Sequence, residues 1–451
     1  MPTNENNLSI MNAIMTIISR LLQNARSISS GLAVLFIFFL ISGCAAPPPL
    51  TLMPTPVIYY ESQVDPFKHL KPAQKKTTEQ VYYATNRTSL GRDGIFAYGN
   101  NRDSKIHLGK ATIRMGAPDT HWEDLSKASL SQNQSEPIPI VLEQINEQTV
   151  LPEDDLTAHY KLTPDQTAFF ESIDADLAEA NDKELMVYVH GTKVDFANST
   201  ILTAEIDHFA GRDFVSVAFA WPSHQNIFHY LIGTDVRRAQ ESSSALKSLL
   251  VLLSEHTSAE QINVLSYSAG ARVTSKALLE LRQLYGVLEQ SELKEKLRIG
   301  SVVFAAADVE IDVFLQRIVP ISEIAQQVVI TVSDNDNALL AAHKFMGGSD
   351  RVGSAEAEDA EETYIVEKEL SNVEIIDVSI GQNIRGFDIV GHHYWYRHPW
   401  MSSDIIFLMR TDLPPSRRGL SAAEQEGIWY LSPDYPEKIR LSAEIELKGH
   451  W

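Results

Sequence analysis

Short apolar segments alternate with longer segments of helical period from residue 184 onward, and no other feature constrains the fold as strongly. The expected strands lie at 185–190, 214–221, 262–266, 301–305, 328–332 and 373–378. The expected helices lie at 201–210, 236–254, 269–284, 309–319 and 338–345. Short, almost wholly apolar strands that alternate with helices are typical of βα units around a parallel sheet buried on both faces. The sequence therefore predicts an α/β fold with a mainly parallel central sheet.

Residues 1–43 have the composition of an export signal peptide. Arg20 and Arg26 precede an apolar run at 32–41, which is about half as long as the ~20 residues of a membrane-spanning helix. The run leads into residues 40–44 (Leu-Ile-Ser-Gly-Cys), which resemble a bacterial lipobox. That resemblance implies cleavage before Cys44 and attachment of lipid to its thiol. Cys44 is the only cysteine of the chain, which excludes an internal disulfide.

Lipidation at Cys44 predicts a protein held to a membrane of the bacterial envelope. Ala45 stands where an aspartate would resemble an inner-membrane retention signal, which favours the outer membrane with the domain facing the periplasm. The inner membrane stays open as the alternative. Prolines at 47–49, 54 and 56 are typical of a stiff, extended spacer. We therefore expect residues 44–78 to form a linker between the lipid anchor and the domain.

The rest of the chain is expected to form one large domain, residues 79–415, which opens with a strand at 80–85. Residues 122–182 are polar and punctuated by proline, and this pattern predicts a loop-rich insertion with a short helix at 164–180. A second insertion is expected at 349–366, which includes an acidic stretch too charged to bury. Each insertion would form either a lid or plain surface. The last residues, 416–451, are expected to form a C-terminal extension packed on the domain.

The composition excludes several kinds of partner. The formal net charge is −21, whereas a nucleic-acid-binding surface has to be basic to displace counterions from phosphates. No spacing of histidine, cysteine and aspartate suggests a metal site, and one cysteine is too few for a thiolate cluster. A glycine-rich phosphate-binding loop is also missing. We expect no nucleic acid, no metal and no cofactor.

The strongest candidate for chemistry is Ser268, in the segment 264–272 (Val-Leu-Ser-Tyr-Ser-Ala-Gly-Ala-Arg) at the junction of an expected strand and an expected helix. A nucleophile elbow occupies such a junction, because the sharp turn lifts the serine hydroxyl to the top of the sheet. The common pattern is G-x-S-x-G, and here the small residues are Ser266 and Gly270. The pattern and its place indicate that Ser268 is the nucleophile of a serine hydrolase.

A second segment, 189–192 (Val-His-Gly-Thr), ends an earlier strand and has the place of an oxyanion loop. In α/β-hydrolases an amide from this loop joins the amide after the nucleophile, and both donate to the oxygen on which charge develops. Here the two amides would be those of Thr192 and Ala269. We expect His190 to orient the loop and not to act as a base.

The acid and the histidine of a catalytic triad should follow the nucleophile in that order. Asp334 and Asp336 come directly after a strand, whereas Asp308 follows the preceding strand and is a third candidate. The neighbouring histidines His392 and His393 follow the last strand, and only one of them can face the serine. In a triad the acid orients the imidazole, and the imidazole takes the serine proton.

Several motifs together resemble an uncharacterised bacterial α/β-hydrolase family, domain of unknown function 900. The matching segments lie in the family's order at 83–87 (Tyr-Ala-Thr-Asn-Arg), 189–191, 221–223 (Trp-Pro-Ser), 264–272, 333–339 and 391–394. The resemblance implies an α/β-hydrolase fold, with a mainly parallel sheet flanked by helices. It also favours Asp336 as the acid and His392, directly after Gly391, as the histidine.

These residues predict a carboxylic ester hydrolase of the cell envelope that acts on small-molecule or lipid esters. Amide hydrolysis is the alternative among enzymes. A non-catalytic hydrolase-fold lipoprotein that binds envelope partners is the alternative outside them, because one fold hosts many functions. The aromatic run 394–396 would either line an acyl pocket or pack in the core. His343 is expected to be a surface or packing histidine.

Overall fold

The computed structural model describes residues 50–60, 64–91, 96–132, 136–153, 160–334, 336–354, 370–379, 392–424 and 427–447. The chain separates into two compact units, residues 1–49 and 50–451. The expected signal peptide and Cys44 belong to the first unit and lie outside the described residues. Within the described ranges, no helix has both the length and the apolar character that crossing a membrane requires.

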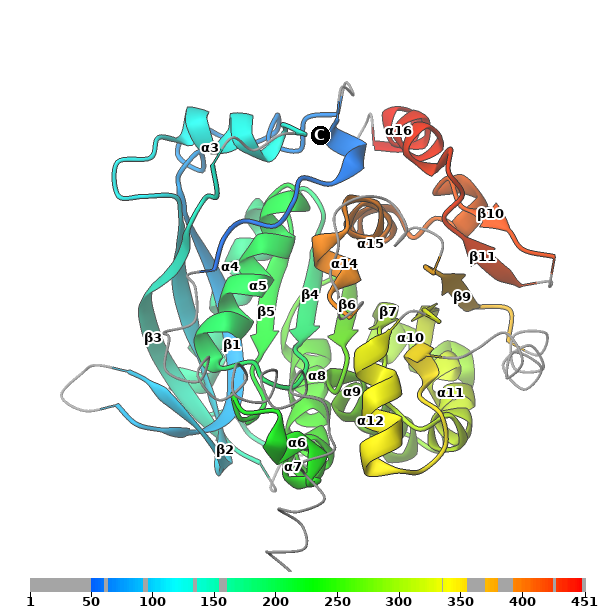
Figure 1. The fold of residues 1–451 in the computed structure, drawn as a ribbon. Coiled ribbons are helices and arrows are strands. Elements are labelled where there is room, and N and C mark those ends of the chain that lie inside the picture. Colours follow the sequence, from blue (N-terminus) through cyan, green and yellow to red (C-terminus); the bar gives the residue numbers. More distant parts are fainter. Residues whose placement is uncertain are drawn as a thin grey trace, which may run out of the picture. The chain divides into compact units, whose positions relative to one another are not determined.

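The second unit is built on a mixed sheet with the strand order β10-β11-β9-β8-β7-β6-β4-β5-β1-β2-β3 (Figure 1). The strands from β11 to β1 in this order are parallel, and antiparallel pairs stand at the two edges. Their bounds are β1 Thr78–Ser89, β2 Tyr98–Met115, β3 Ile140–Pro152, β4 Glu184–Val189, β5 Val215–Phe219, β6 Gln261–Tyr267, β7 Ile299–Ala305, β8 Ala325–Val332, β9 Val373–Asp377, β10 Ser421–Ala422 and β11 Ile428–Tyr430. The predicted α/β fold is confirmed.

The central strands are buried on both faces, which explains their almost continuous apolar sequences. In β4, Leu185, Val187 and Val189 pack into one hydrophobic core, while Met186 and Tyr188 pack into the other. Successive side chains of a strand point to opposite faces of the sheet. A strand between two layers of helices therefore needs apolar residues at every position.

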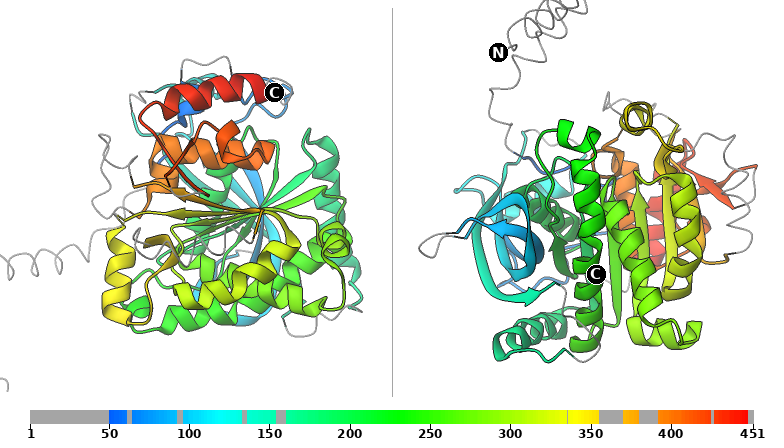
Figure 2. Two further views of the ribbon diagram at one scale, coloured as in Figure 1. Left: turned by 90° about the vertical axis from the view of Figure 1, so that its right-hand side faces the viewer. Right: turned by 90° about the horizontal axis from the view of Figure 1, so that it is seen from below.

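Helices cover both faces of the sheet, as the views in Figure 2 show. One face is covered by α4 (Pro164–Glu179), α8 (Ser243–His256), α9 (Gly270–Leu284), α10 (Gln290–Leu297) and α11 (Ile311–Ile324). The other is covered by α5 (Phe196–Phe209), α14 (Tyr394–Arg397) and α15 (Pro399–Thr411), with α16 (Tyr435–Glu446) against α15. The shorter elements include η3 (Val57–Tyr59), α3 (Trp122–Ser129), α6 (Phe228–Leu231), α7 (Thr234–Glu241), α12 (Asn337–Met346) and η4 (Val352–Ser354).

The expected helix at 236–254 is divided in the structure. The helix α7 ends at Glu241 and α8 begins at Ser243, so Ser242 lies at the division. The amide of Asn86, at the end of β1, donates to the hydroxyl of Ser242 at 3.1 Å. This contact ties the division to the sheet, and it depends on a residue more than 150 positions away in the sequence.

Residues 50–60 and 64–78 pack as part of the domain and do not form the free linker that the prolines predict. Leu52, Met53 and Ile58 are buried in the core that also contains α5 and α15. The backbone of Leu52 donates to the carbonyl of Ile138 at 2.8 Å, so this segment also pairs next to β3. The apolar residues near the prolines pack the segment onto the domain, whereas the linker was predicted from the prolines alone.

The expected loop-rich insertion at 122–182 is largely regular structure. It contains α3, the long strand β3 and α4, whose start at Pro164 is fixed by a capping box between Thr163 and Gln166. The strand β3 pairs with β2 along its length, and many of its side chains face solvent. A half-exposed edge strand reads as polar sequence, which is why the strand was missed. Of the second expected insertion, residues 355–366 lie outside the described residues.

The C-terminal segment continues the sheet in addition to packing on it. The strand β11 pairs in parallel with β9, and β10 completes a short hairpin at this edge. Tyr435, Ile439 and Ala443 of α16 are buried in the core of the α15 face. Residues 416–424 and 427–447 are therefore part of the domain, although the sequence predicted an extension.

Candidate active site

Ser268 stands on a tight turn between β6 and α9. Its φ is +53°, a left-handed conformation that residues other than glycine rarely adopt. Its N–H donates to the carbonyl of Ala305 at 2.9 Å, and its own carbonyl accepts from the N–H of Asp308 at 3.2 Å. These two bonds hold the turn at the carboxyl end of β6, which is the place of a nucleophile elbow.

Small residues around the serine let the helix α9 approach the loop that follows β4. A Cβ atom at Gly270 would lie 2.4 Å from the carbonyl oxygen of Val189, so a larger residue does not fit there. A Cβ atom at Gly191 would lie 3.0 Å from the Cβ of Ser268. Ser266 replaces the first glycine of the common pattern without leaving a polar group unsatisfied, because its buried hydroxyl donates to the carbonyl of Val303 at 3.0 Å.

His392 contacts both Ser268 and Asp336. Its Nε2 lies 2.8 Å from Ser268 Oγ, and its Nδ1 lies 2.7 Å from Asp336 Oδ2. The other carboxylate oxygen of Asp336 accepts the amides of Ala338 and Leu339 at 3.1 Å, because Asp336 is the N-cap of α12. With Nδ1–H donating to the carboxylate, Nε2 is left as the acceptor for the serine hydroxyl. The buried carboxyl of Asp336 is thus fixed at both oxygens.

The other candidates for the acid and the histidine have different contacts. Asp334 is exposed, and its backbone N–H donates to the hydroxyl of Ser379. Asp308 is buried, but its carboxylate pairs with arginines. The ring of His393 packs beside Tyr396, with centroids 5.7 Å apart. Gly391, which the resemblance places directly before the histidine, lies outside the described residues.

The loop after β4 is held by a neutral His190. Its Nδ1 lies 2.6 Å from the carbonyl of Gly191, and its Nε2 faces the guanidinium of Arg87 at 3.4 Å. A ring that donates through Nδ1 and accepts through Nε2 is the neutral tautomer. Burial and the positive charge of Arg87 lower the pKa of His190 to about 3. This histidine therefore orients the loop, as expected, and cannot serve as a base that gains a proton near neutral pH.

Arg87 is a positioning residue that the sequence argument missed. It is fully buried, and its guanidinium donates to the carbonyls of Ala220, Gly99 and Val194 as well as to Asn100. Val194 lies two residues after Thr192, so Arg87 fixes the far end of the expected oxyanion loop. The segment 83–87 could have indicated that Arg87 matters, because this segment is part of the family resemblance. Its sequence does not show which loop Arg87 contacts.

An ion-pair network lies beneath the elbow. Asp308, whose N–H holds the carbonyl of Ser268, pairs with Arg351 at 2.9 Å and with Arg272 at 3.2 Å. Both arginines also pair with Glu310, at 3.0 Å and 2.7 Å respectively. Arg351 is completely buried and Arg272 nearly so. A buried charge needs such partners, because the interior does not solvate it.

The same network reaches the loop that carries the acid. Next to Arg351, Gly353 donates its N–H to the carbonyl of Ala307 at 2.9 Å, and its carbonyl accepts the N–H of Ser333 at 2.9 Å. Ser333 stands three residues before Asp336. The loops that carry Ser268 and Asp336 are therefore held by one buried cluster. No sequence motif predicts this cluster.

The remaining candidates have structural surroundings. Tyr394 and Trp395 are buried in the core of the α15 face, so these two residues of the aromatic run pack inside the protein. His343 is about a third exposed, and its Nδ1 lies 3.2 Å from a carboxylate oxygen of Asp350. In the described ranges of the chain, no three histidine, cysteine or carboxylate side chains are grouped as metal ligands.

The fold and the contacts of Ser268 together define an α/β hydrolase. The chain belongs to the family of α/β hydrolases of unknown function, DUF900, whose model matches residues 165–409, more than half of the chain. The resemblance inferred from the sequence motifs is thereby confirmed. The matched region contains Ser268, Asp336 and His392, whereas the strands β1–β3 lie outside it. No curated protein is significantly similar in sequence.

Solved structures of similar fold are distant in sequence. The esterase Pf2001 of Pyrococcus furiosus is 14% identical, with 51% of this chain and 84% of that chain covered and a TM-score of 0.29. Esterase 2 of Thermogutta terrifontis, phosphoramylated by tabun, is 11% identical, with the same coverage and a TM-score of 0.28. The acylaminoacyl peptidase of Pyrococcus horikoshii is 11% identical, with 73% and 56% covered and a TM-score of 0.31. Likenesses at this level carry no argument about substrate.

Proposed function

We propose that this protein is a serine hydrolase that cleaves carboxylic esters. The observation that carries the proposal is the relay of contacts from Ser268 through His392 to Asp336, at 2.8 Å and 2.7 Å. Nucleophilic catalysis by serine needs a base within hydrogen-bond distance, and that base needs an acid that fixes its tautomer. Hydrogen-bonded neighbours satisfy both requirements here.

The reaction proceeds in two steps. Ser268 Oγ attacks the ester carbonyl, and its proton passes to His392 Nε2, which then protonates the departing alcohol. Water attacks the resulting acyl-enzyme, again with His392 as the base, and the carboxylic acid leaves as Ser268 regains its proton. Asp336 stays ionised and stabilises the imidazolium that forms in each step.

The developing oxyanion is held by the backbone amides of Ala269 and Thr192. Ala269 directly follows Ser268. The loop of Thr192 lies close to Ser268 as well, since a Cβ atom at Gly191 would lie 3.0 Å from the Cβ of Ser268. Two fixed donors aimed at the oxygen stabilise the transition state, and the loss of one costs about 3–4 kcal/mol. The bonds that His190 and Arg87 make to this loop keep it in place before substrate arrives.

The proposed place of action is the cell envelope. Lipidation of Cys44 would hold the domain on the periplasmic face of the outer membrane, where lipid esters and small esters are both within reach. Metabolic labelling with a palmitate analogue tests this, since Cys44→Ser should abolish the label and release the protein from the outer-membrane fraction. Label retained in Cys44→Ser, or wild type found with the inner membrane, would contradict it.

A fluorophosphonate probe tests the chemistry directly. The folded wild type should react covalently, whereas Ser268→Ala should not, and a series of p-nitrophenyl esters should be hydrolysed only by the wild type. Ser258→Ala is the control, because Ser258 is an exposed serine that precedes β6, at the opposite end of this strand from Ser268. An unlabelled wild type would overturn the proposal. Faster turnover of a matched amide than of the ester would assign amide hydrolysis in its place.

A further inference from the structure

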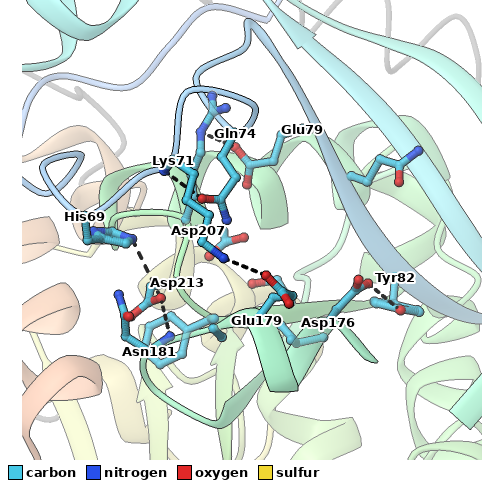
Figure 3. Close-up of a pocket in the computed structure, with 16 residues that line it drawn as sticks. His69, Lys71, Gln74, Glu79, Tyr82, Asp176, Glu179, Asn181, Asp207 and Asp213 are labelled. Atoms are coloured by element: carbon cyan, nitrogen blue, oxygen red, sulfur yellow. Dashed lines mark hydrogen bonds and ion pairs between the residues drawn. The ribbon is translucent and has the colours of Figure 1, made fainter. Parts of the chain in front are cut away.

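A cavity of about 270 Å³ lies near the amino ends of the parallel strands, away from Ser268 (Figure 3). It is lined by Glu79 near the start of β1, by Ser216 near the start of β5 and mainly by other polar side chains. Both strands run parallel to β6, whose carboxyl end leads to Ser268. An ester that reacts at Ser268 therefore has to place its apolar part elsewhere, at the carboxyl edge of the sheet.

The segment around α6, which follows β5, exposes three large apolar side chains. Ile227 is 41% exposed, Phe228 is 59% exposed and Ile232 is 56% exposed. The N–H of Ile232 donates to the carbonyl of Phe228 at 3.0 Å, so these two side chains lie on the same side of one helical turn. Single exposed apolar residues are ordinary on a protein surface, whereas several that are grouped together mark a binding surface. We call these three residues the α6 patch.

Tyr230 holds the α6 patch close to the nucleophile. Its buried hydroxyl donates to the carboxylate of Asp308 and accepts from Nε of Arg272 at 3.1 Å. The N–H of Asp308 in turn donates to the carbonyl of Ser268 at 3.2 Å. The helix α6 also packs against α12, whose N-cap is Asp336, and Figure 1 shows both helices at the same end of the sheet. The patch therefore lies beside the loops that carry the nucleophile and the acid.

We propose that the α6 patch binds the alkyl chain of an ester substrate, so that the hydrolase prefers lipid esters to esters of short acids and alcohols. The inference rests on the proposed function, since it names the substrate class of the same site. The position of the patch determines its occupant, because the reacting carbonyl has to lie at Ser268 Oγ and the rest of the ester extends from there over the neighbouring surface. Burial of one methylene group contributes about a fourfold gain in binding. The patch should therefore raise kcat/KM as the alkyl chain lengthens.

Two series of esters, measured with the full protein chain below their critical micelle concentrations, test this proposal. In p-nitrophenyl esters from acetate to octanoate the acyl chain lengthens, and in alkyl acetates from methyl to octyl the alcohol chain lengthens. In at least one series, the wild type should have a kcat/KM at least tenfold higher for the eight-carbon chain than for the shortest one. That series identifies which part of the ester the patch binds.

Phe228→Ser combined with Ile232→Ser should lower this ratio at least fivefold, because the alkyl chain loses its apolar contacts. Leu441→Ser combined with Ile445→Ser is the matched control. These two residues of α16 are also four positions apart, are 55% and 72% exposed, and should leave the ratio unchanged when replaced. Labelling by the fluorophosphonate probe establishes that each variant is folded. If the double variant at α6 is not labelled, Phe228→Ser alone decides, with an expected loss of at least twofold.

A wild type whose kcat/KM rises with chain length in neither series overturns the proposal and leaves ester hydrolysis intact. An unchanged ratio in the folded α6 variants, or an equal fall in the α16 control, overturns it as well. A ratio that rises only above the critical micelle concentration would assign the patch to a lipid surface, and dimers that the α6 variants abolish in sedimentation would assign it to a second copy. Both results contradict the proposal. A wild type that neither reacts with the probe nor hydrolyses any ester would contradict the proposed function itself, and this inference with it.

Discussion

At the scale of single residues, two neighbouring histidines differ in what they contact. His392 joins Ser268 to Asp336, whereas the ring of His393 lies beside Tyr396. Adjacent side chains leave the backbone in different directions, so one of the pair can complete a triad while the other packs elsewhere. The sequence indicated these two histidines as candidates, and the family resemblance favoured His392. The structure shows that their contacts differ.

Replacing each histidine separately tests this difference. His392→Ala should lower kcat for a p-nitrophenyl ester by about four to six orders of magnitude, because the serine loses its base. His393→Ala should leave kcat within about tenfold of the wild type. Stopped-flow or steady-state rates measure both. Loss of activity in His393→Ala with activity retained in His392→Ala would reverse the assignment.

His190 predicts a specific dependence of stability on pH. Its pKa is about 3 in the folded protein and 6.5 in its ordinary state, so between these values the unfolded chain binds a proton that the folded chain does not. The free energy of unfolding should therefore be highest above pH 6.5 and fall as the pH decreases toward 3, with a slope of up to about 1.4 kcal/mol per pH unit from this residue.

Urea unfolding at pH 4.5 to 7.5 measures that slope. His190→Gln keeps an amide in place of the ring and cannot be protonated, so its stability should fall less steeply with decreasing pH than that of the wild type. The variant should be less stable above pH 6.5, because the stack on Trp221 and the bond to Gly191 are lost. An unchanged slope would show that this histidine does not titrate on unfolding.

At the scale of elements, the loops at the carboxyl edge of the sheet are joined by buried arginines. Arg351 pairs with both Asp308 and Glu310, and its side chain is fully buried. Arg87 holds the loop after β4 through hydrogen bonds, because its guanidinium donates to the carbonyls of Val194 in this loop and of Ala220 after β5. The active-site loops thus depend on charged side chains that come from distant parts of the chain.

Arg351→Met should lower the free energy of unfolding by about 3–5 kcal/mol, because it leaves buried carboxylates with fewer positive partners. Arg351→Lys keeps the charge and should lose less. Arg417→Met is the matched control: Arg417 pairs with Glu446 at 2.5 Å but is 54% exposed, and such surface pairs contribute about 0–1 kcal/mol. Urea unfolding compares the three. An equal loss at both arginines would argue against the buried network.

At the scale of the whole molecule, the segment before the first strand belongs to the domain. Leu52, Met53, Ile58 and Phe67 are buried by at least 95%, and the N–H of Met53 donates to the carboxylate of Glu205 in α5. Burial raises the pKa of Glu205 to about 8. The segment therefore covers both apolar surface and a buried carboxyl group.

Removing this segment should prevent folding. A chain that begins at residue 79 loses several side chains whose burial contributes about 1.5–3 kcal/mol each, a loss comparable with the about 5–15 kcal/mol of a typical domain. A chain that begins at residue 50 should stay folded, because it keeps the whole second unit. Circular dichroism and urea unfolding distinguish the two. Equal stability of both chains would show that residues 50–78 are a linker after all.

The sequence alone determined the parts of this protein whose signals are local. The continuous apolar strands and the small residues around Ser268 are each signals within a few positions of the chain. The central sheet and the turn that carries Ser268 could therefore be predicted. Asp336 and His392 were reached as members of short lists, with the family resemblance making the choice.

The tertiary structure decided what depends on partners far apart in the chain. The edge strand β3 looks polar because many of its side chains face solvent, and β11 reaches the parallel part of the sheet through β9. The segment 50–60 becomes core because α5 and α15 cover it. His392 contacts Ser268 only because the loops come together in the fold. For the same reason Arg87 is buried among carbonyls and Arg351 beside carboxylates. A side chain's partner is a property of the folded chain, and the sequence records only which partners are available.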